Sequence, residues 1–382
     1  MAFNVAMVLK ITGIVLLVIL VIVTIFVVYV GYRFRNAKDK GALQSSIDKA
    51  GNAFVGSGKS YGLVIGIYKE GNTSVNGYGS LQKGGTIAPD GSAIMELAST
   101  SKLFTTAVLQ LLCDEGLLHL DNKVADLLQG KVILPANAQQ TTLRQLATHT
   151  SGFPPLPQSF LAKMTDDSNP YKDLCVQDLY DYLRHCTGKK QEGKFEYSNF
   201  GMGLLGHILE LQTNTKYETL VKDKLLSKLA MDNTFITANT MQQSKIAQGY
   251  NEAGAPNPIW LDTVLTGAGS YLSDAQDMLR FINANLANDR TPVSPSLLKA
   301  QEPQPGGETA LGWILPSATD RFMGNNHVLW HNGMSGGYAS FLAIDKVAQN
   351  GVIILSDKAV DVTSLGMKLM WLVRTQSWKL KD

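Results

Sequence analysis

Strand-like segments lie near both ends of this 382-residue sequence, and helical patterns occupy the middle. Five runs rich in β-branched and aromatic residues are expected to be strands: 61–68, 73–80, 327–331, 337–344 and 352–355. A closing helix is expected from Val362 to about Trp378. Because the strands are split between the termini, the simplest architecture is one antiparallel sheet with flanking helices and an all-helical insertion. The sequence therefore predicts an α+β fold, an α/β sandwich plus a helical subdomain.

A long apolar segment precedes this region. Ile11 to Tyr32 is almost wholly apolar and uncharged, and it has about the twenty residues that a helix needs to span a bilayer. A cleaved signal peptide would have a shorter apolar core and a small-residue cleavage site, and neither is visible here. We expect an N-terminal tail at 1–10, an uncleaved transmembrane helix at 11–32 and a linker at 33–42.

The charges that flank this segment bear on its orientation. Lys10 lies on one side, and the other side carries Arg33, Arg35, Lys38 and Lys40. The positive-inside rule by itself would place the large C-terminal region in the cytoplasm.

The overall composition excludes several classes of function. With 34 basic and 32 acidic residues the formal net charge is +2, which argues against nucleic acid as a partner. Three cysteines do not make a disulfide scaffold, and the six histidines show no metal-binding spacing. We expect no metal and no organic cofactor.

The segment from Met95 to Phe104 contains the first chemical motif. Apolar residues recur at helical spacing from Leu103 onward, so Ser99 lies at or near the start of a buried helix. Lys102 follows three residues later, and its amine can reach the Ser99 hydroxyl because residues i and i+3 share one helical face. This arrangement is typical of an activated nucleophile, although a serine at a helix start is also a common N-cap.

The motif S-x-x-K also occurs at two other places, Ser46 to Lys49 and Ser296 to Lys299. We interpret both as parts of surface helices. The pattern alone is therefore weak evidence for catalysis.

A second motif, Y-x-N, is formed by Tyr197 and Asn199. In an extended loop both side chains can point into one cleft, where a phenol relays a proton and an amide holds a substrate carbonyl or a lysine. A helix N-terminus capped by Asn199 is an equally good interpretation of the same residues.

The third motif, H-x-G, follows a predicted strand and is formed by His331 and Gly333. Glycine would let a substrate approach the strand edge, and the backbone amide of Met334 could donate to an oxyanion together with that of Ser99. A lone histidine at a strand end is more often structural. Residues 333–337 also fit a G-x-S-x-G elbow, but His331 is the last histidine, so no α/β-hydrolase triad can follow Ser335.

The ordered set S-x-x-K, Y-x-N, H-x-G resembles the penicillin-recognising serine hydrolases, in particular the class C β-lactamase and DD-peptidase branch, from about Leu43 to the C-terminus. The resemblance implies that Ser99 is the acylated nucleophile and that Lys102 and Tyr197 are the base and acid pair. It implies that Asn199 contacts the substrate and the lysine. His331 would help to hold a substrate carboxylate or a proton network.

One departure from the family pattern affects the expected substrate. His331 takes the position that is lysine in many class C β-lactamases, and imidazole is a weaker anion anchor near neutral pH than an ammonium. Peptidase or esterase activity is therefore favoured over efficient β-lactam hydrolysis.

The sequence thus predicts a membrane-anchored serine hydrolase that forms an acyl-enzyme with an amide or ester, of the DD-peptidase, esterase or β-lactamase type. Its hydrolase domain would span 43–382, with the sheet part at 43–98 and 305–382 and the mainly helical part at 99–304. The resemblance implies a small-molecule or peptide substrate and an extracytoplasmic (periplasmic) domain, against the flanking charges. The alternative is a non-catalytic, penicillin-binding-like or scaffolding module at the membrane, and the oligomeric state is left open.

Overall fold

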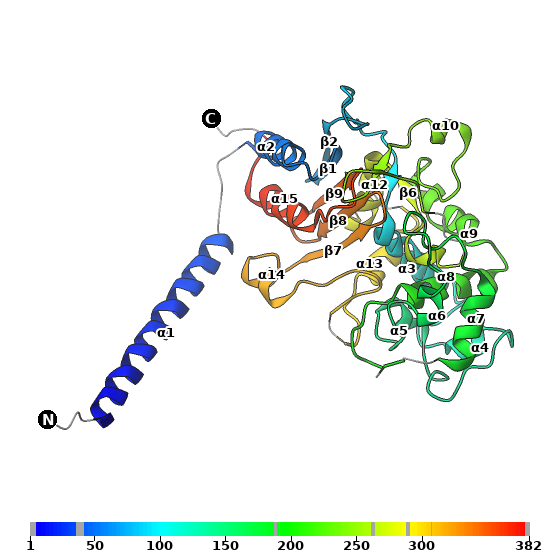
Figure 1. Cartoon of the computed structure of the whole chain (residues 1–382), viewed down its shortest axis with the longest axis horizontal. Helices are drawn as coiled ribbons and strands as arrows, with labels where there is room; N and C mark the ends of the chain where they lie inside the picture. The colour runs from blue at the N-terminus through cyan, green and yellow to red at the C-terminus, as the bar shows by residue number, and fades with distance from the viewer. Residues whose placement is uncertain are drawn as a thin grey trace.

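A five-stranded antiparallel sheet lies at the centre of the protein (Figure 1). The computed structural model describes residues 5–35, 42–186, 189–190, 192–260, 264–287, 291–306 and 308–378. The strand order is β2-β1-β9-β8-β7. The strands are β1 (Gly62–Lys69), β2 (Asn72–Gly79), β7 (Val328–Met334), β8 (Ala339–Asp345) and β9 (Asn350–Ser356).

Pairing between β1 and β9 joins the two ends of the chain. Leu63 lies opposite Ser356, and the register continues to Lys69 opposite Asn350. The predicted antiparallel sheet built from both termini is therefore confirmed. Strand β7 continues to Met334 instead of ending near His331, so the H-x-G triplet is part of the strand.

Helices cover both faces of the sheet, because side chains along a strand alternate between faces. Leu63, Ile65 and Ile67 pack in one core cluster with helices α2 (Leu43–Gly56) and α15 (Thr363–Thr375). The opposite face packs against α12 (Ala275–Leu286), which belongs in sequence to the predicted helical insertion. The sheet is thus the middle layer of a sandwich.

The helical region lies beside this sandwich (Figure 1). Its helices are α3 (Lys102–Asp114), α4 (Val124–Leu127), α5 (Leu143–Ala147), α6 (Gln158–Leu161), α7 (Val176–His185), α8 (Asn199–Thr213), α9 (Tyr217–Lys224), α10 (Thr240–Gln243), α11 (Thr266–Gly269) and α13 (Ser294–Ala300), with the 3-10 helices η1 (Ala98–Ser101) and η2 (Leu226–Leu229). The short helix α14 (Ala318–Phe322) precedes β7 and lies on the side of the sheet away from this region (Figure 1). Two short antiparallel pairs complete the fold, β3 (Met95–Glu96) with β6 (Leu272–Ser273) and β4 (Gly249–Tyr250) with β5 (Pro256–Asn257).

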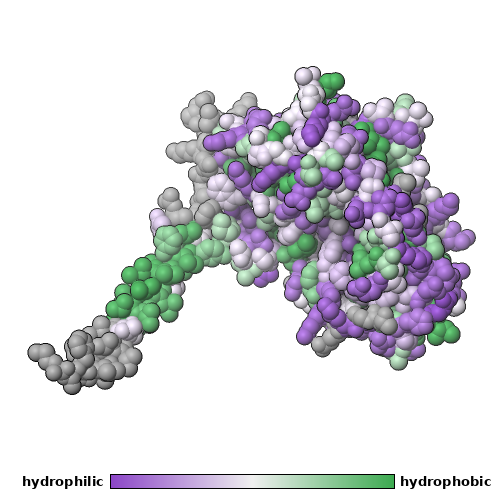
Figure 2. All heavy atoms as spheres, viewed as in Figure 1, coloured by the Kyte–Doolittle hydropathy of each residue, from purple (hydrophilic) through white to green (hydrophobic). Residues whose placement is uncertain are grey.

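The N-terminal helix α1 (Val5–Arg35) projects away from the rest of the protein, and its surface is apolar along most of its length (Figures 1 and 2). Its segment Thr12–Tyr32 has 21 residues and a mean hydropathy of 3.3, so it is long and apolar enough to cross a membrane. A signal sequence has the same character. The helix already includes residues 33–35 of the predicted linker, and residues 36–41 lie outside the described residues.

Candidate active site

Ser99 lies in η1, at the junction between strand β3 and helix α3. The preceding residue, Ala98, has a φ of 45°, a conformation that is costly for a residue with a Cβ. Hydrogen bonds to β8 hold the segment: the Ser340 hydroxyl donates to the Leu97 carbonyl at 2.6 Å and lies 2.8 Å from the Thr100 hydroxyl. These hydrogen bonds from β8 fix the position of the segment that carries Ser99.

Lys102 is fully buried directly beside Ser99. Its Nζ donates to Ser99 Oγ at 2.9 Å, to Asn199 Oδ1 at 2.8 Å and to the Ala268 carbonyl at 2.5 Å. Three acceptors match the three N–H bonds of an ammonium. The structure thus brings together the S-x-x-K and Y-x-N motifs, whose residues are 97 positions apart.

Tyr197 lies in the loop before α8, and its ring centroid is 5.0 Å from Lys102 Nζ. Burial raises the pKa of Tyr197 above its usual range, and a hydrogen bond with Ser99 acts in the opposite direction. The phenol therefore keeps its proton at neutral pH and can donate it.

The start of α8 explains how Asn199 becomes available. The cap is Ser198, whose Oγ accepts from the Gly201 amide at 2.8 Å. Asn199 is the first helical residue, so its side chain is free of the capping role and reaches Lys102. The alternative prediction that a helix begins here is confirmed, but its cap is Ser198 and not Asn199.

His331 is buried, with 1% of its surface exposed, and lies inside β7. Its Nδ1 is 2.6 Å from the Asn332 carbonyl, which can only accept, so Nδ1 carries the proton. Burial, and secondarily the charge of Lys102, lower the pKa of His331 to about 3. The imidazole is neutral, and its Nε2 is a bare acceptor that has no hydrogen-bond partner among the described residues.

Gly333 and Met334 complete the predicted set. A Cβ on Gly333 would lie 2.2 Å from the Leu97 carbonyl oxygen and 2.8 Å from the Ser99 nitrogen, so only glycine lets β7 pass this close to the serine. Met334 ends the strand, and its side chain is 57% exposed at the edge of the pocket.

His149 was not assigned a role from the sequence. It follows α5 with a φ of 58°, and its ring lies 4.4 Å from that of Tyr197. Its Nδ1 accepts from the Ser198 amide at 3.1 Å, and burial lowers its pKa well below the usual value. The sequence signal that could have found it is the segment T-H-T-S-G at residues 148–152.

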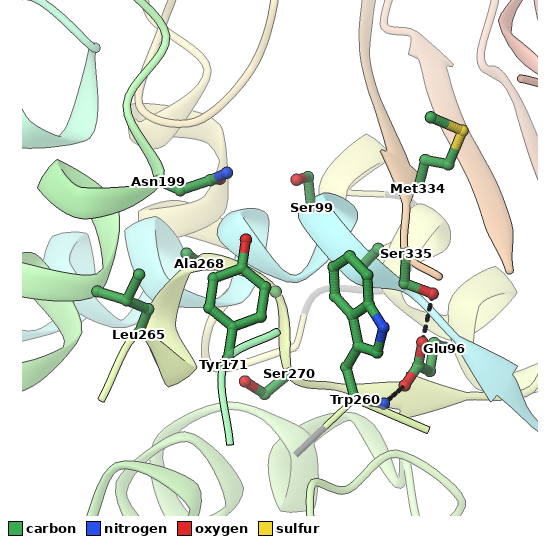
Figure 3. A pocket seen from close by; sticks show the side chains of 12 residues that line it. Glu96, Ser99, Tyr171, Asn199, Trp260, Leu265, Ala268, Ser270, Met334 and Ser335 are labelled. Atoms are coloured by element: carbon green, nitrogen blue, oxygen red, sulfur yellow. Dashed lines mark hydrogen bonds between the residues drawn. The ribbon is translucent and has the colours of Figure 1, made fainter. Parts of the chain in front are cut away.

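A pocket opens beside Ser99, and twelve described residues line it (Figure 3). It is formed by η1, the start of α8, α11, the end of β7 and the segments around Tyr171 and Trp260. The rings of Tyr171 and Trp260 meet edge to face at 5.3 Å and form an aromatic wall. Among the described residues, no group of His, Cys, Asp or Glu side chains is arranged to hold a metal ion.

Glu96, three residues before Ser99, also lines this pocket. Its carboxylate accepts from the Trp260 backbone amide at 2.6 Å and from the Ser335 hydroxyl (Figure 3). The residue is only 4% exposed, and burial raises the pKa of Glu96 to about 7. Sequence reasoning missed this residue, because nothing in the residues around Glu96 indicates that its carboxyl group is buried.

Comparison with known proteins agrees with this geometry. A family model described as Beta-lactamase matches residues 47–369. The chain is 25% identical over 313 residues to penicillin-binding protein 4 from Amycolatopsis lactamdurans, which covers 76% of this chain and 79% of that protein. Alignments with several other curated relatives span less than two thirds of those proteins.

Solved structures share the fold. A β-lactamase/D-alanine carboxypeptidase from Pseudomonas syringae superposes with a TM-score of 0.75 at 21% identity, covering 87% of this chain and 98% of that one. A class C β-lactamase from Rhodobacter sphaeroides gives a TM-score of 0.73 at 22% identity, covering 86% of this chain and 98% of that one.

Because the family model matches most of the sequence, this chain belongs to the Beta-lactamase family. It is a serine hydrolase of the β-lactamase and penicillin-binding type. The resemblance identified from the three ordered motifs is confirmed.

Proposed function

We propose that this protein cleaves an amide or ester through an acyl-enzyme on Ser99. The observation that carries the proposal is the position of Lys102 Nζ, which is within hydrogen-bond distance of both Ser99 Oγ and Asn199 Oδ1. A serine becomes a nucleophile when an adjacent group can take its proton.

The reaction follows from the groups around Ser99. Once the pair Lys102 and Tyr197 has lost one proton to solvent, its basic member takes the hydroxyl proton while Ser99 Oγ forms a bond to the substrate carbonyl carbon. The backbone amides of Ser99 and Met334 would stabilise the oxyanion, and Gly333 allows β7 to approach η1 closely enough for both to face one oxygen. The leaving group departs with the proton from Tyr197. Water then attacks the acyl-serine ester, which releases the acid and restores Ser99.

Of the two roles expected for His331, the structure supports the proton network better than the contact with a substrate carboxylate. Its side chain is buried and neutral, and it is not among the residues that line the pocket. This supports a role in the hydrogen-bonded surroundings of Tyr197, whose ring centroid lies 6.2 Å from that of His331.

We further propose that the segment 11–32 anchors the chain in a membrane as a single pass and that 43–382 forms the hydrolase domain outside the cytoplasm. The apolar helix supports the anchor. The family resemblance, which implies action on cell-wall peptides or lactams outside the cytoplasm, supports the outward orientation, whereas the flanking charges oppose it. Protease treatment of intact spheroplasts tests the orientation: cleavage of the domain is expected, and full protection would place it in the cytoplasm.

Intact-mass spectrometry of the detergent-solubilised protein tests the acyl-enzyme. After incubation with a fluorophosphonate, we expect one adduct that maps to Ser99 and is absent from Ser99→Ala. A parallel incubation with a penicillin asks whether the site admits lactams. If the folded protein forms no fluorophosphonate adduct, the non-catalytic module is the better interpretation.

A further inference from the structure

We propose that the pocket beside Ser99 takes uncharged substrates and discriminates against those that carry a carboxylate near the scissile carbonyl. The inference rests on the proposed acyl-enzyme function and adds the substrate class. It concerns the groups that the substrate meets on either side of the reacting bond.

The charges around the pocket are the first observation. Of the twelve described residues that line it, none is lysine, arginine or histidine, and Glu96 is the only aspartate or glutamate. A substrate carboxylate that leaves water needs a charged or hydrogen-bonded partner to offset its desolvation. Among these twelve residues a cationic partner is missing, and the hydroxyl and amide groups of Ser99, Asn199, Ser270 and Ser335 are neutral.

The two basic side chains nearest to Ser99, Lys102 and His331, do not supply a partner for a substrate carboxylate. Lys102 directs its ammonium to Ser99, Asn199 and the Ala268 carbonyl, beneath the pocket floor. His331 is neutral. Its Nδ1 donates to the Asn332 carbonyl, so its Nε2 is an acceptor. An acceptor repels a carboxylate oxygen.

The edge of the pocket is apolar where an anion anchor would be useful. Met334 presents a thioether at the end of β7, and Leu265, Tyr171 and Trp260 add apolar and aromatic surface to the lining. Such a surface favours burial of hydrocarbon or aromatic groups.

Glu96 adds an unfavourable charge. Its carboxylate sits below Ser335 and beside Trp260 (Figure 3). With a pKa raised to about 7 it is mostly ionised at pH 8, and like charges in a partly desolvated site repel.

A matched pair of esters tests the proposal on the detergent-solubilised full chain. The phenylacetate ester of methyl 3-hydroxybenzoate is neutral, and that of 3-hydroxybenzoic acid differs only in its free carboxylate. At pH 8, after subtraction of spontaneous hydrolysis, we expect kcat/KM to be at least about tenfold higher for the neutral ester, mainly through KM.

Two variants should each lower the ratio of kcat/KM for the neutral ester to kcat/KM for the acid at least about threefold. Glu96→Gln removes the charge while keeping the shape, and Met334→Lys adds a cation at an exposed position that tolerates it. Glu302→Gln is the matched control, because it removes an exposed glutamate outside the pocket, and the preference should be unchanged.

The outcomes separate the two proposals. If a neutral fluorophosphonate labels Ser99 but the two esters react equally well, or the acid reacts faster, the substrate inference is wrong and the acyl-enzyme stands. A preference that neither variant alters would also overturn it. If Ser99 is not labelled and neither ester is cleaved, the acyl-enzyme proposal fails first.

Discussion

Three buried side chains near Ser99, those of His149, Tyr197 and His331, are each held in one protonation state near neutral pH by their surroundings. His149 and His331 are neutral because burial disfavours the imidazolium. Tyr197 keeps its proton for the same reason. Ser99, the proposed nucleophile, therefore lies among groups that do not change their protonation state easily, and we expect acylation to require that the pair Lys102 and Tyr197 first loses one proton.

The Glu96 carboxyl makes stability depend on pH. Its pKa is raised from 4.5 to about 7 on folding, so its contribution to stability is complete below pH 4.5 and is lost as the pH rises to 7. The Glu96→Gln variant does not lose this stability as the pH rises, because glutamine does not ionise. Between pH 4.5 and pH 8, the free energy of unfolding of the variant relative to wild type should rise by up to about 3 kcal/mol, as urea denaturation at both pH values measures. A difference that stays constant with pH would contradict the burial of an ionisable Glu96.

The phenol of Tyr197 is expected to matter for rate and little for folding. Tyr197→Phe should lower kcat/KM about 10²–10⁴-fold on an ester substrate, the usual range for one general acid or base. Tyr180→Phe is the control, since its hydroxyl pairs with His207 outside the pocket. Equal activity of both variants would remove Tyr197 from the reaction.

At the scale of elements, the helix starts and the strand edge set the geometry of the site. Helix α8 begins where Ser198 caps it, which presents Asn199 to Lys102. Strand β7 passes η1 at Gly333, where the space allows no side chain. Two predictions follow from these two contacts.

Loss of the α8 cap should cost activity as well as stability. Ser198→Ala removes the acceptor for the Gly201 amide and the donor to the Pro154 carbonyl, and such a change costs about 1–2 kcal/mol. Asn239→Ala removes a comparable cap from the exposed helix α10. Thermal unfolding should report a loss in both variants, whereas kcat/KM should fall only in Ser198→Ala; equal activities would show that Asn199 does not depend on the cap.

Gly333→Ala should inactivate the protein while leaving it folded. The new Cβ would meet backbone atoms of Leu97 and Ser99, so β7 or η1 must move, and we expect the two amides proposed to bind the oxyanion to separate. Removal of one such donor typically costs about 10²–10³ in kcat. Gly56→Ala is the control because no atom lies within 4 Å of its Cβ position. A fully active Gly333→Ala protein, measured by ester hydrolysis, would contradict the close approach.

At the scale of the whole molecule, the hydrolase region is built to stand without α1. The β1–β9 pairing joins both ends of the domain into one sheet, and helices cover its two faces. Helix α1 exposes its apolar side chains, so it adds little to this core.

Removal of residues 1–41 should therefore give a protein that is soluble without detergent and retains kcat/KM within about twofold of the full chain. Sedimentation with lipid vesicles should be seen for the full chain alone, because only it keeps the apolar helix. An insoluble or inactive truncated protein would show that the helix is part of the folded domain.

Much of this could be predicted from local patterns. Runs rich in β-branched and aromatic residues located the strands, helical spacing placed Ser99 at a helix start, and the order of three motifs identified the family. The predicted contact between Lys102 and Asn199 appears in the structure because both lie at helix starts that face each other. Glu96 and His149 were missed. The residues around them in the sequence do not show whether a polar side chain is buried or exposed.

The sequence by itself determined which elements form, because hydrophobic periodicity and turn residues act over a few positions. It also determined which reactive groups are present. Only the tertiary structure decided their state: Glu96 meets Ser335 across 239 positions, and the burial of His331 makes it a neutral acceptor instead of an anion anchor. Desolvation and long-range pairing depend on what surrounds a side chain in space, and no local pattern contains that information.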